Sequence, residues 1–444
     1  MQEKVDIRTK GVVDVMGRYT LTAWPSIVFD VERSHDCYLY DSLSDAEYLD
    51  FFTFAAMNPI GFNHPAMREP RFLDKLAKAA LVKPNLSRFY TADLAHWVET
   101  FTRVCGRSYF KHYFFIEGGA LAVENALKAA FDWKIRKNND KGLSPDPRIG
   151  IIHFEEAFHG RSGYTLSLTN TADPRKTQYY PRFDWPRITN PKCRFPLTGR
   201  NLRDAITLEK RALQEIDDVI KLRGEQLAGI VVEPVQCDGG DNHFRPEFFQ
   251  NLRKTCDENE FLLIFDEIQT GIGITGKMWA FEHFGVVPDI LCFGKKAQIA
   301  GIGATERIDD VDNVFRVPQR IGSTAGGNLV DMIRGTQFLE IIEKENLVEN
   351  AAHMGSFLLG EVQKLAERYP GTIQNVRGLG LLVAFDFPST EERDEFVRRC
   401  FEKRLLMMTA EPRTIRLRPF LDVKREHIVE LIDIMQKALD EMRG

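Results

Sequence analysis

The amino-acid sequence predicts an α/β fold, in which helices cover both faces of a largely parallel sheet. Two observations support this: apolar runs of four to eight residues recur without strict alternation, and helical patterns follow them. A strand buried on both faces reads as a continuous apolar run, and strands that alternate with helices build parallel sheets. The runs expected to be strands are 112–116, 149–154, 227–235, 261–265 and 290–293.

The two ends of the chain differ in pattern from its middle. Segments 37–41 and 48–52 are typical of a hairpin, whereas beyond about residue 331 long amphipathic helices flank 372–387 and 414–417. Apolar side chains of the last helix recur at helical spacing and are expected in the core, namely Ile428, Leu431, Ile432, Met435, Leu439 and Met442.

The length of 444 residues suggests two or three domains rather than one. We expect residues 65–330 to form a large domain and residues 331–444 a C-terminal small domain. Residues 1–64 are expected to be an N-terminal segment that contributes to the small domain.

The composition excludes several classes of protein. Lys and Arg total 59 against 64 Asp and Glu, a net charge of -5, which disfavours nucleic-acid binding. The first residues lack the apolar core of a signal peptide, and no run of 18 apolar residues could span a membrane. The seven cysteines contain no CxxC pair, and the ten histidines lack metal-ligand spacing. We therefore expect a cytoplasmic protein with reduced thiols and no metal.

One pair of motifs favours a nucleotide-binding protein instead. Residues 262–267 are an apolar strand ending in Asp-Glu, and 271–277 match a glycine-rich phosphate loop. However, Met278 stands where a Ser or Thr must reach the metal, and the loop does not directly follow a strand. This reading stays open as the distant alternative.

Four features, in this order along the chain, point to a different cofactor. The turn 117–120 enters a helix, where backbone N–H groups can hold a phosphate, and the aromatic-His-Gly segment 157–160 can stack on a flat ring. Asp266 ends an apolar strand, where a carboxylate is costly unless a cation meets it. Lys295 ends the next strand, where a lowered pKa makes the amine nucleophilic. Each feature alone is usually structural, and the set is specific.

The residues around these features resemble the class III (subgroup II) aminotransferases, which use pyridoxal 5'-phosphate. The segments that carry the resemblance are 265–269, 288–290, 294–295 and 323–328. The resemblance implies fold type I, with a mostly parallel seven-stranded sheet in the large domain and a small α+β domain built from both termini. It runs from about residue 20 to the C-terminus.

Three longer segments are similar to one branch of that class, the L-lysine 6-aminotransferases. They are 115–126, 158–170 and 239–249. This similarity implies that L-lysine donates its 6-amino group to 2-oxoglutarate, giving L-glutamate and an aldehyde that cyclises. The open alternative is another ω-aminotransferase, acting on ornithine, 4-aminobutyrate or a diamine.

The family resemblance also assigns the cofactor-binding residues. Backbone N–H groups of Gly119 and Ala120 would hold the cofactor phosphate, and Thr324 would reach the phosphate in the neighbouring subunit, which implies a homodimer with active sites at the interface. Phe158 would stack on the pyridine ring. Asp266 would pair with the ring nitrogen and keep it protonated.

The resemblance assigns the reacting amine to Lys295, which bonds to the cofactor and then moves the proton between substrate and cofactor. Gln269 would lie near the phenolic oxygen of the ring and the substrate. Lys296 is the competing choice. The spacing from 288–290 favours Lys295, and adjacent strand positions point to opposite faces.

Two arginines and one aspartate are implied to handle the substrates. Arg161 resembles the residue that binds the remote carboxylate, and Arg416 the one that pairs with the α-carboxylate of the keto acid. Asp238 stands where the class usually has a Glu that masks this arginine while the amine substrate is bound. Because Asp is one methylene shorter, we expect a longer ion pair or a shifted backbone.

Overall fold

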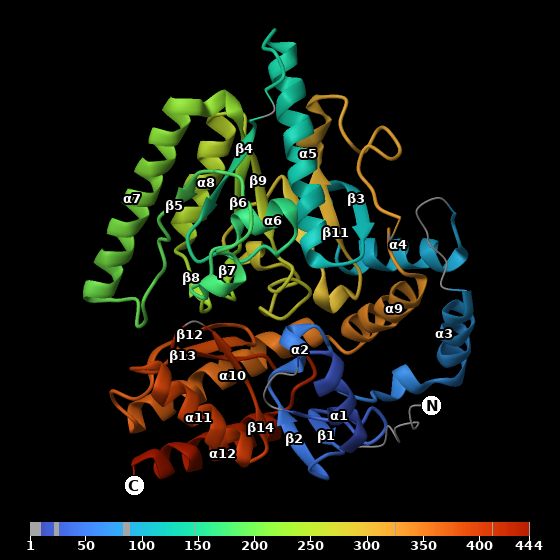
Figure 1. Ribbon diagram of the computed structural model, residues 1–444, viewed down its shortest axis with the longest axis vertical. Helices are drawn as coiled ribbons and strands as arrows, with labels where there is room; N and C mark the ends of the chain where they lie inside the picture. Colours follow the sequence, from blue (N-terminus) through green and yellow to red (C-terminus); the bar gives the residue numbers. More distant parts are fainter. Residues whose placement is uncertain are drawn as a thin grey trace.

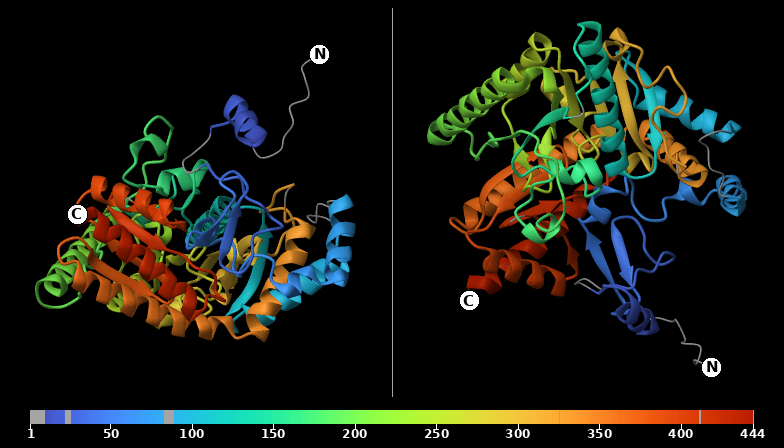
Figure 2. Two further views of the ribbon diagram at one scale, coloured as in Figure 1. Left: turned by 90° about the horizontal axis from the view of Figure 1, so that it is seen from below. Right: turned by 45° about the horizontal axis from the view of Figure 1, so that its top comes forward.

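The computed structural model describes residues 10–21, 26–82, 89–146, 148–324, 326–410 and 412–443. A large α/β part packs against a smaller part in which segments from both ends of the chain meet (Figure 1). Helix α1 (Lys10–Tyr19) lies apart from both (Figure 2). Within these ranges, no helix is long and apolar enough to cross a membrane.

A seven-stranded sheet forms the centre of the large part. Its strands lie in the order β3-β11-β10-β9-β6-β4-β5. In that order their bounds are Phe110–Ile116, Ala300–Thr305, Ile290–Phe293, Leu262–Asp266, Leu227–Val232, Gly150–Phe154 and Arg187–Ile188. Strand β11 is antiparallel to its neighbours β10 and β3, and the pairs from β10 to β5 are parallel. The expected fold class is confirmed.

The strands are buried on both faces because helices cover both. On β9, Leu262 and Ile264 pack in the cluster that contains α5 (Gly119–Asp140). The alternate residues Leu263 and Phe265 pack on the other side with α8 (Pro246–Glu258). This alternation on a wholly apolar strand is the physical basis of the sequence pattern.

Strand β6 ends three residues before the predicted end. Glu233 and Pro234 interrupt it, and a proline has no N–H to donate to a neighbouring strand. The chain then forms the short hairpin β7 (Val235–Gln236) and β8 (Asn242–His243). The loop 237–241 between them carries Asp238.

The smaller part contains two sheets. In the first, β2 (Ala46–Asp50) lies between β1 (Tyr38–Asp41) and β14 (Leu405–Leu406), so an N-terminal strand pairs with a C-terminal one. The second has the order β12-β13-β16-β15, with bounds Gln374–Leu379, Leu382–Asp386, Thr414–Leu417 and Met408–Ala410. We propose domain boundaries at 64/65 and 330/331, which this pairing supports.

The other helices complete both parts. Helices α10, α11 and α12 span Leu347–Arg368, Thr390–Glu402 and Arg425–Arg443. Helices α2, α3, α4, α6, α7 and α9 span Thr53–Ala56, Pro70–Val82, Ala92–Val104, Gly163–Leu168, Gly199–Arg223 and Leu329–Lys344. On α12 the expected core residues Ile428, Leu431, Ile432, Met435 and Leu439 are buried, and Met442 is only partly buried against the same core. All seven cysteines are buried and free of disulfide bonds.

Candidate active site

Lys295 follows β10 at the carboxyl edge of the sheet. It begins a short 3-10 helix, η5 (Lys295–Ala297), and its φ of 46° lies in the left-handed region. The Nζ atom donates a hydrogen bond to the carbonyl oxygen of Ala55 at 2.8 Å. Burial lowers the pKa of Lys295 to about 8, and the nearby charges of Arg416 and Arg418 lower it as well. The amine is therefore partly unprotonated near neutral pH, as a nucleophile requires.

Lys296 points elsewhere. Its fully buried Nζ donates to the carbonyl oxygen of Gln269 at 2.7 Å. Burial, and then the charge of Lys295, lower the pKa of Lys296 to about 7. The sequence argument from strand alternation is wrong in its reason, because β10 ends at Phe293 and both lysines lie in η5. The turn at Lys295 separates the two amines.

Asp266 ends β9 next to Lys295 in the sheet order, and its side chain is almost fully buried. One carboxylate oxygen lies 2.8 Å from Nδ1 of His159, and the other accepts from the backbone N–H of Ile268 at 3.1 Å. Glu233 is also close, and burial together with the charge of Asp266 raises the pKa of Glu233 well above its usual range. Two acids in one buried region favour a cation there.

His159 has a role that sequence reasoning did not assign. The residue was singled out only as part of the aromatic-His-Gly segment, yet its ring is buried against Asp266. Its Nε2 atom has no hydrogen-bond partner among the described residues. The signal available in the sequence was the position of this segment directly after β4.

The glycine turn and the aromatic-His-Gly segment pack against each other. Gly118, with a φ of 89°, precedes α5, whose first N–H groups come from Gly119 and Ala120. A Cβ on Gly160 would lie 2.6 Å from that of Ala120, so only glycine allows this approach. The partly buried Phe158 donates its backbone N–H to Glu233 Oε1 at 2.9 Å. The structure thus brings the predicted phosphate seat, Phe158 and Asp266 to one region.

Arg416 lies on β16, is buried, and is held by backbone carbonyls. Its guanidinium donates to the carbonyl oxygens of Cys237 at 2.8 Å and Thr409 at 3.1 Å. Its Nη2 lies 3.8 Å from Asp238 Oδ1, which is a long ion pair. The other oxygen of Asp238 accepts from Lys176 Nζ at 3.3 Å. Sequence analysis did not identify Lys176.

Arg418 is a second buried cation at this site that sequence analysis missed. It forms an ion pair with Asp241 in which both side chains are 0% exposed. Its Nε donates to Gln269 Oε1 at 3.3 Å, so it holds the side chain of a predicted site residue. The signal was its spacing of two from Arg416 in an extended segment, where alternate residues share a face; Arg418 directly follows the end of β16.

Two predicted residues are exposed in the single chain. Arg161 lies between the aromatic-His-Gly segment and α6, and Thr324 lies on the loop before α9. Among the described residues, neither forms a hydrogen bond or an ion pair with the buried cluster around Asp266, and both stay predictions.

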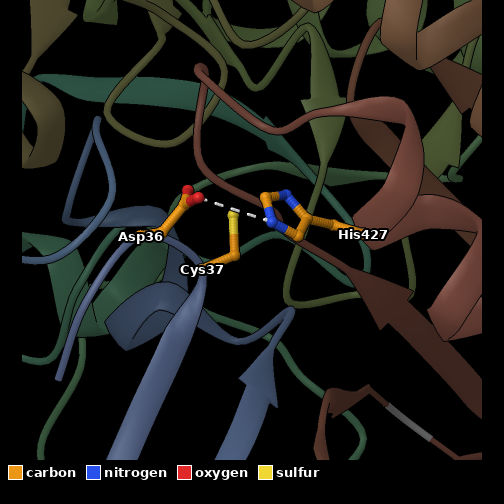
Figure 3. A group of neighbouring side chains, drawn as sticks. All are labelled: Asp36, Cys37 and His427. Atoms are coloured by element: carbon orange, nitrogen blue, oxygen red, sulfur yellow. Dashed lines mark ion pairs between the residues drawn. The ribbon is translucent and has the colours of Figure 1, made fainter.

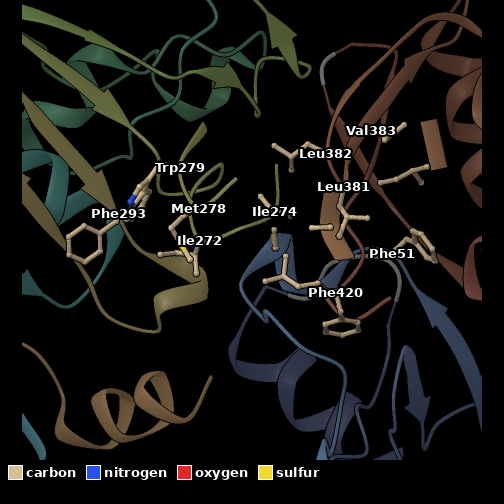
Figure 4. Close-up of a cluster of buried hydrophobic side chains, with 14 of the residues drawn as sticks. Phe51, Ile272, Ile274, Met278, Trp279, Phe293, Leu381, Leu382, Val383 and Phe420 are labelled. Atoms are coloured by element: carbon tan, nitrogen blue, oxygen red, sulfur yellow. The ribbon is translucent and has the colours of Figure 1, made fainter. Parts of the chain in front are cut away.

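The structure gives the nucleotide-like motif a packing role. The carboxylate of Glu267 accepts hydrogen bonds from the backbone N–H groups of Ala280 at 2.7 Å and Phe281 at 2.8 Å. Burial raises the pKa of Glu267 to about 8. The glycine loop packs on the small part, where Ile274 lies beside Leu381 and Leu382 (Figure 4). Both halves of the motif are therefore occupied by protein contacts.

Among the residues that the structure describes, one group of side chains is close enough to share a metal ion: Asp36, Cys37 and His427 (Figure 3). The ring Nδ1 of His427 accepts the backbone N–H of Lys424 at 3.2 Å, so Nε2 of the neutral ring carries the proton toward Asp36. Lys424 Nζ already binds Asp36 at 2.7 Å, and burial raises the pKa of the Cys37 thiol. We interpret the group as a polar contact, anchored by the ion pair of Asp36 with Lys424, that joins the N-terminal segment to the start of α12.

Comparisons with known proteins find relatives over almost the whole of this chain. The model of the family Aminotransferase class-III matches residues 21–439. The L-lysine-epsilon aminotransferase of Mycobacterium tuberculosis (strain H37Rv) is 46% identical over 430 residues, covering 96% of this chain and 95% of that protein. The L-lysine-epsilon aminotransferase of Amycolatopsis lactamdurans is 42% identical, covering 97% of this chain and 96% of that protein.

Solved structures give the same answer. Lysine aminotransferase from M. tuberculosis in the internal aldimine form superposes with a TM-score of 0.94 at 46% identity, covering 97% of this chain and 99% of that one. An ornithine aminotransferase from Toxoplasma gondii, at 21% identity and a TM-score of 0.81, shares the fold.

Proposed function

The chain belongs to the class-III aminotransferases, and we propose that it transfers the 6-amino group of L-lysine to 2-oxoglutarate. The observation that carries the proposal is the meeting of Lys295, Asp266 and the start of α5 at one edge of the sheet, in a chain closely similar to L-lysine-epsilon aminotransferases. The products are L-glutamate and 2-aminoadipate 6-semialdehyde, which cyclises to piperideine-6-carboxylate.

The cofactor is pyridoxal 5'-phosphate, and the residues present fit it. This group supplies an aldehyde carbon and a ring that accepts electrons when the substrate loses a proton. Gly119 and Ala120 offer backbone N–H groups for the phosphate at the start of α5, where Gly118 provides no side-chain cap. Asp266, held by His159, offers a buried carboxylate for the protonated ring nitrogen, and Phe158 offers an aromatic face. The partner subunit's Thr324 would complete the phosphate site.

Lys295 holds and moves the proton. Its pKa of about 8 leaves a substantial neutral fraction at physiological pH, so Nζ can accept a proton from the substrate carbon and return it. Gln269 is held through its own side chain by Arg418 and through its backbone carbonyl by Lys296. These contacts fix the amide that would orient the ring and substrate.

The two substrates make opposite demands on one arginine. Arg416 would bind the α-carboxylate of 2-oxoglutarate, while Arg161 would bind the remote carboxylate of either substrate. While lysine is bound, Asp238 would neutralise Arg416 across the 3.8 Å pair. Asp238→Ala should then slow the lysine half-reaction more than the keto-acid half-reaction. An unchanged lysine half-reaction would show that Asp238 has no such role.

A homodimer fits the exposed features of the single chain. Helix α1 projects from the body, and Met16, Tyr19 and Leu21 near its end are exposed apolar side chains. Covering them on a second subunit removes apolar surface from water. Sedimentation equilibrium tests this, and a monomer would contradict it.

The protein is also proposed to act in the cytoplasm.

The direct test is the formation of the cyclic imine when the purified holoenzyme receives lysine and 2-oxoglutarate together. Single-turnover absorbance changes with lysine, ornithine, 4-aminobutyrate and a diamine then rank the amine donors. Lysine should react fastest. A faster reaction with 4-aminobutyrate or a diamine would overturn the substrate assignment while leaving the aminotransferase family unchanged.

A further inference from the structure

The carboxylate of Asp238 lies between two cations and contacts each with a different oxygen. Oδ1 is 3.8 Å from Arg416 Nη2, and Oδ2 is 3.3 Å from Lys176 Nζ. The lysine contact is the shorter of the two and is close enough for a hydrogen bond, whereas the arginine contact is not. Asp238 is thus already shared between two partners.

The two cations differ in how firmly they are held. Arg416 is buried, and carbonyl oxygens of Cys237 and Thr409 fix its guanidinium. Lys176 ends the 3-10 turn η2 (Pro174–Lys176), and about a quarter of its side chain is exposed, at 25%. A lysine stem has four rotatable bonds, so Lys176 can follow a moving carboxylate while Arg416 cannot.

The turn that carries Lys176 is itself well defined. Asp173 accepts the backbone N–H of Arg175 at 3.1 Å, and the N–H of Lys176 bonds to the carbonyl oxygen of Asp173 at 3.2 Å. The backbone of Lys176 is therefore set at one place beside the loop 237–241, and only its side chain needs to move.

Displacement of Asp238 creates an electrostatic problem that a second cation solves. When the carboxylate of a keto acid takes Arg416, Asp238 loses that partner and faces an incoming anion. A short aspartate cannot swing far into solvent, because it has one methylene fewer than glutamate. A cation within 3.3 Å gives the displaced carboxylate a partner after a small rotation.

We propose that Lys176 is a positioning residue for the keto-acid half-reaction, which receives Asp238 when the α-carboxylate of the keto acid binds to Arg416. The proposal rests on the proposed function, in which Arg416 serves both half-reactions. It assigns Lys176 no contact with substrate. Lys176 acts only through Asp238, and its removal should leave Asp238 on Arg416.

The first experiment separates the two half-reactions by rapid-mixing absorbance in the holoenzyme. For Lys176→Met, the apparent dissociation constant for 2-oxoglutarate should rise about two- to fivefold, the range for a partly exposed ion pair. The lysine half-reaction should stay unchanged, and Lys176→Arg should restore the wild-type value. Equal changes in both half-reactions, or none in either, would overturn the proposal.

A matched control removes a positive charge one residue away. Arg175 pairs with Asp173 at the surface, so Arg175→Met changes the net charge equally but leaves Asp238 untouched. It should not alter either half-reaction. If Arg175→Met weakens the keto-acid half-reaction as much as Lys176→Met does, the effect comes from the overall positive charge of the turn. That result would refute a specific role of Lys176.

A double-variant cycle tests whether Lys176 acts through Asp238. In an Asp238→Asn background, Lys176→Met should have no further effect on the keto-acid half-reaction. An effect that persists at full size would mean that Lys176 binds the keto acid directly, against the proposal. Thermal melting of each variant checks that the fold is intact, and Lys176→Gln serves as a second truncation.

Binding of glutarate, an unreactive dicarboxylate, gives a readout that does not depend on turnover. Calorimetry on the holoenzyme should show the same two- to fivefold weakening in Lys176→Met. If wild-type enzyme fails to react with lysine, the proposed function fails while this titration still tests Lys176. If wild-type enzyme runs both half-reactions and glutarate binds the variant equally well, only the inference about Lys176 fails.

Discussion

The buried ion pair between Arg418 and Asp241 should be essential to the folded state, and Asp241→Asn tests this. Both side chains are 0% exposed. Asparagine at this position keeps an oxygen that can accept, so among the described residues the guanidinium is left with neutral acceptors such as the Leu417 carbonyl at 3.0 Å and Gln269 Oε1 at 3.3 Å, and no counter-ion in direct contact. Breaking a buried pair from one side costs about 3–5 kcal/mol, because a charge stays buried without its counter-ion.

The upper half of that range is expected, about 4–5 kcal/mol, since Arg416 and Lys295 are positive groups in the same region. The measurement is the free energy of unfolding from urea denaturation, followed by far-UV circular dichroism. Asp433→Asn, at an exposed position of α12, is the control and should change the unfolding free energy by less than about 0.5 kcal/mol.

A compensating variant separates a lost charge from a lost shape. Arg418→Met combined with Asp241→Asn removes the unpaired cation and should recover about 2 kcal/mol or more of the loss. If Asp241→Asn alone costs less than about 1 kcal/mol, or if the double variant is less stable than the single one, the argument from a buried uncompensated charge is refuted.

Three further predictions concern the lysines and the turn beside them. Lys295→Ala should abolish the absorption band of covalently held cofactor, whereas Lys296→Met should keep it; the reverse result would assign the reacting amine to Lys296. In the apoprotein, burial holds the pKa of Lys296 near 7, below its value in the unfolded chain, so the unfolded state binds more protons above pH 7. The free energy of unfolding of the wild type should therefore rise relative to that of Lys296→Met between about pH 7 and 10. A free-energy difference between the two proteins that stays flat or falls with pH would contradict this. Ala55 has a φ of 60°, a left-handed conformation that strains an alanine, so Ala55→Gly should stabilise the protein by about 1 kcal/mol and keep the carbonyl contact to Lys295. As a control, Ala366→Gly in the right-handed helix α10 should destabilise the protein by a similar amount. Calorimetric melting that shows both variants destabilised would contradict backbone strain at Ala55.

The fold was predictable because its strands carry a strong local signal. Strands such as β9 and β10 are continuous apolar runs, since both of their faces are covered. Strand β11 was not expected, because Ala300-Gly-Ile-Gly-Ala-Thr305 has two glycines and little apolar bulk. Strand β11 fits between β10 and β3 because its glycines leave room for neighbouring side chains. A Cβ on Gly301, for example, would lie 2.6 Å from the ring of Phe293.

The sequence by itself determined the α/β class and the family, and it predicts cofactor residues at strand ends and helix starts, because these features depend on local order along the chain. Only the tertiary structure decided how the two lysines point, since a left-handed turn at Lys295 follows the strand and the two amines bond to different carbonyl oxygens. It alone also revealed His159 against Asp266, Arg418 against Asp241, and Lys176 against Asp238. Each pair is an ion pair or a hydrogen bond between side chains that lie 62 to 177 residues apart in the sequence. A local sequence pattern does not indicate which distant partner a buried polar group contacts.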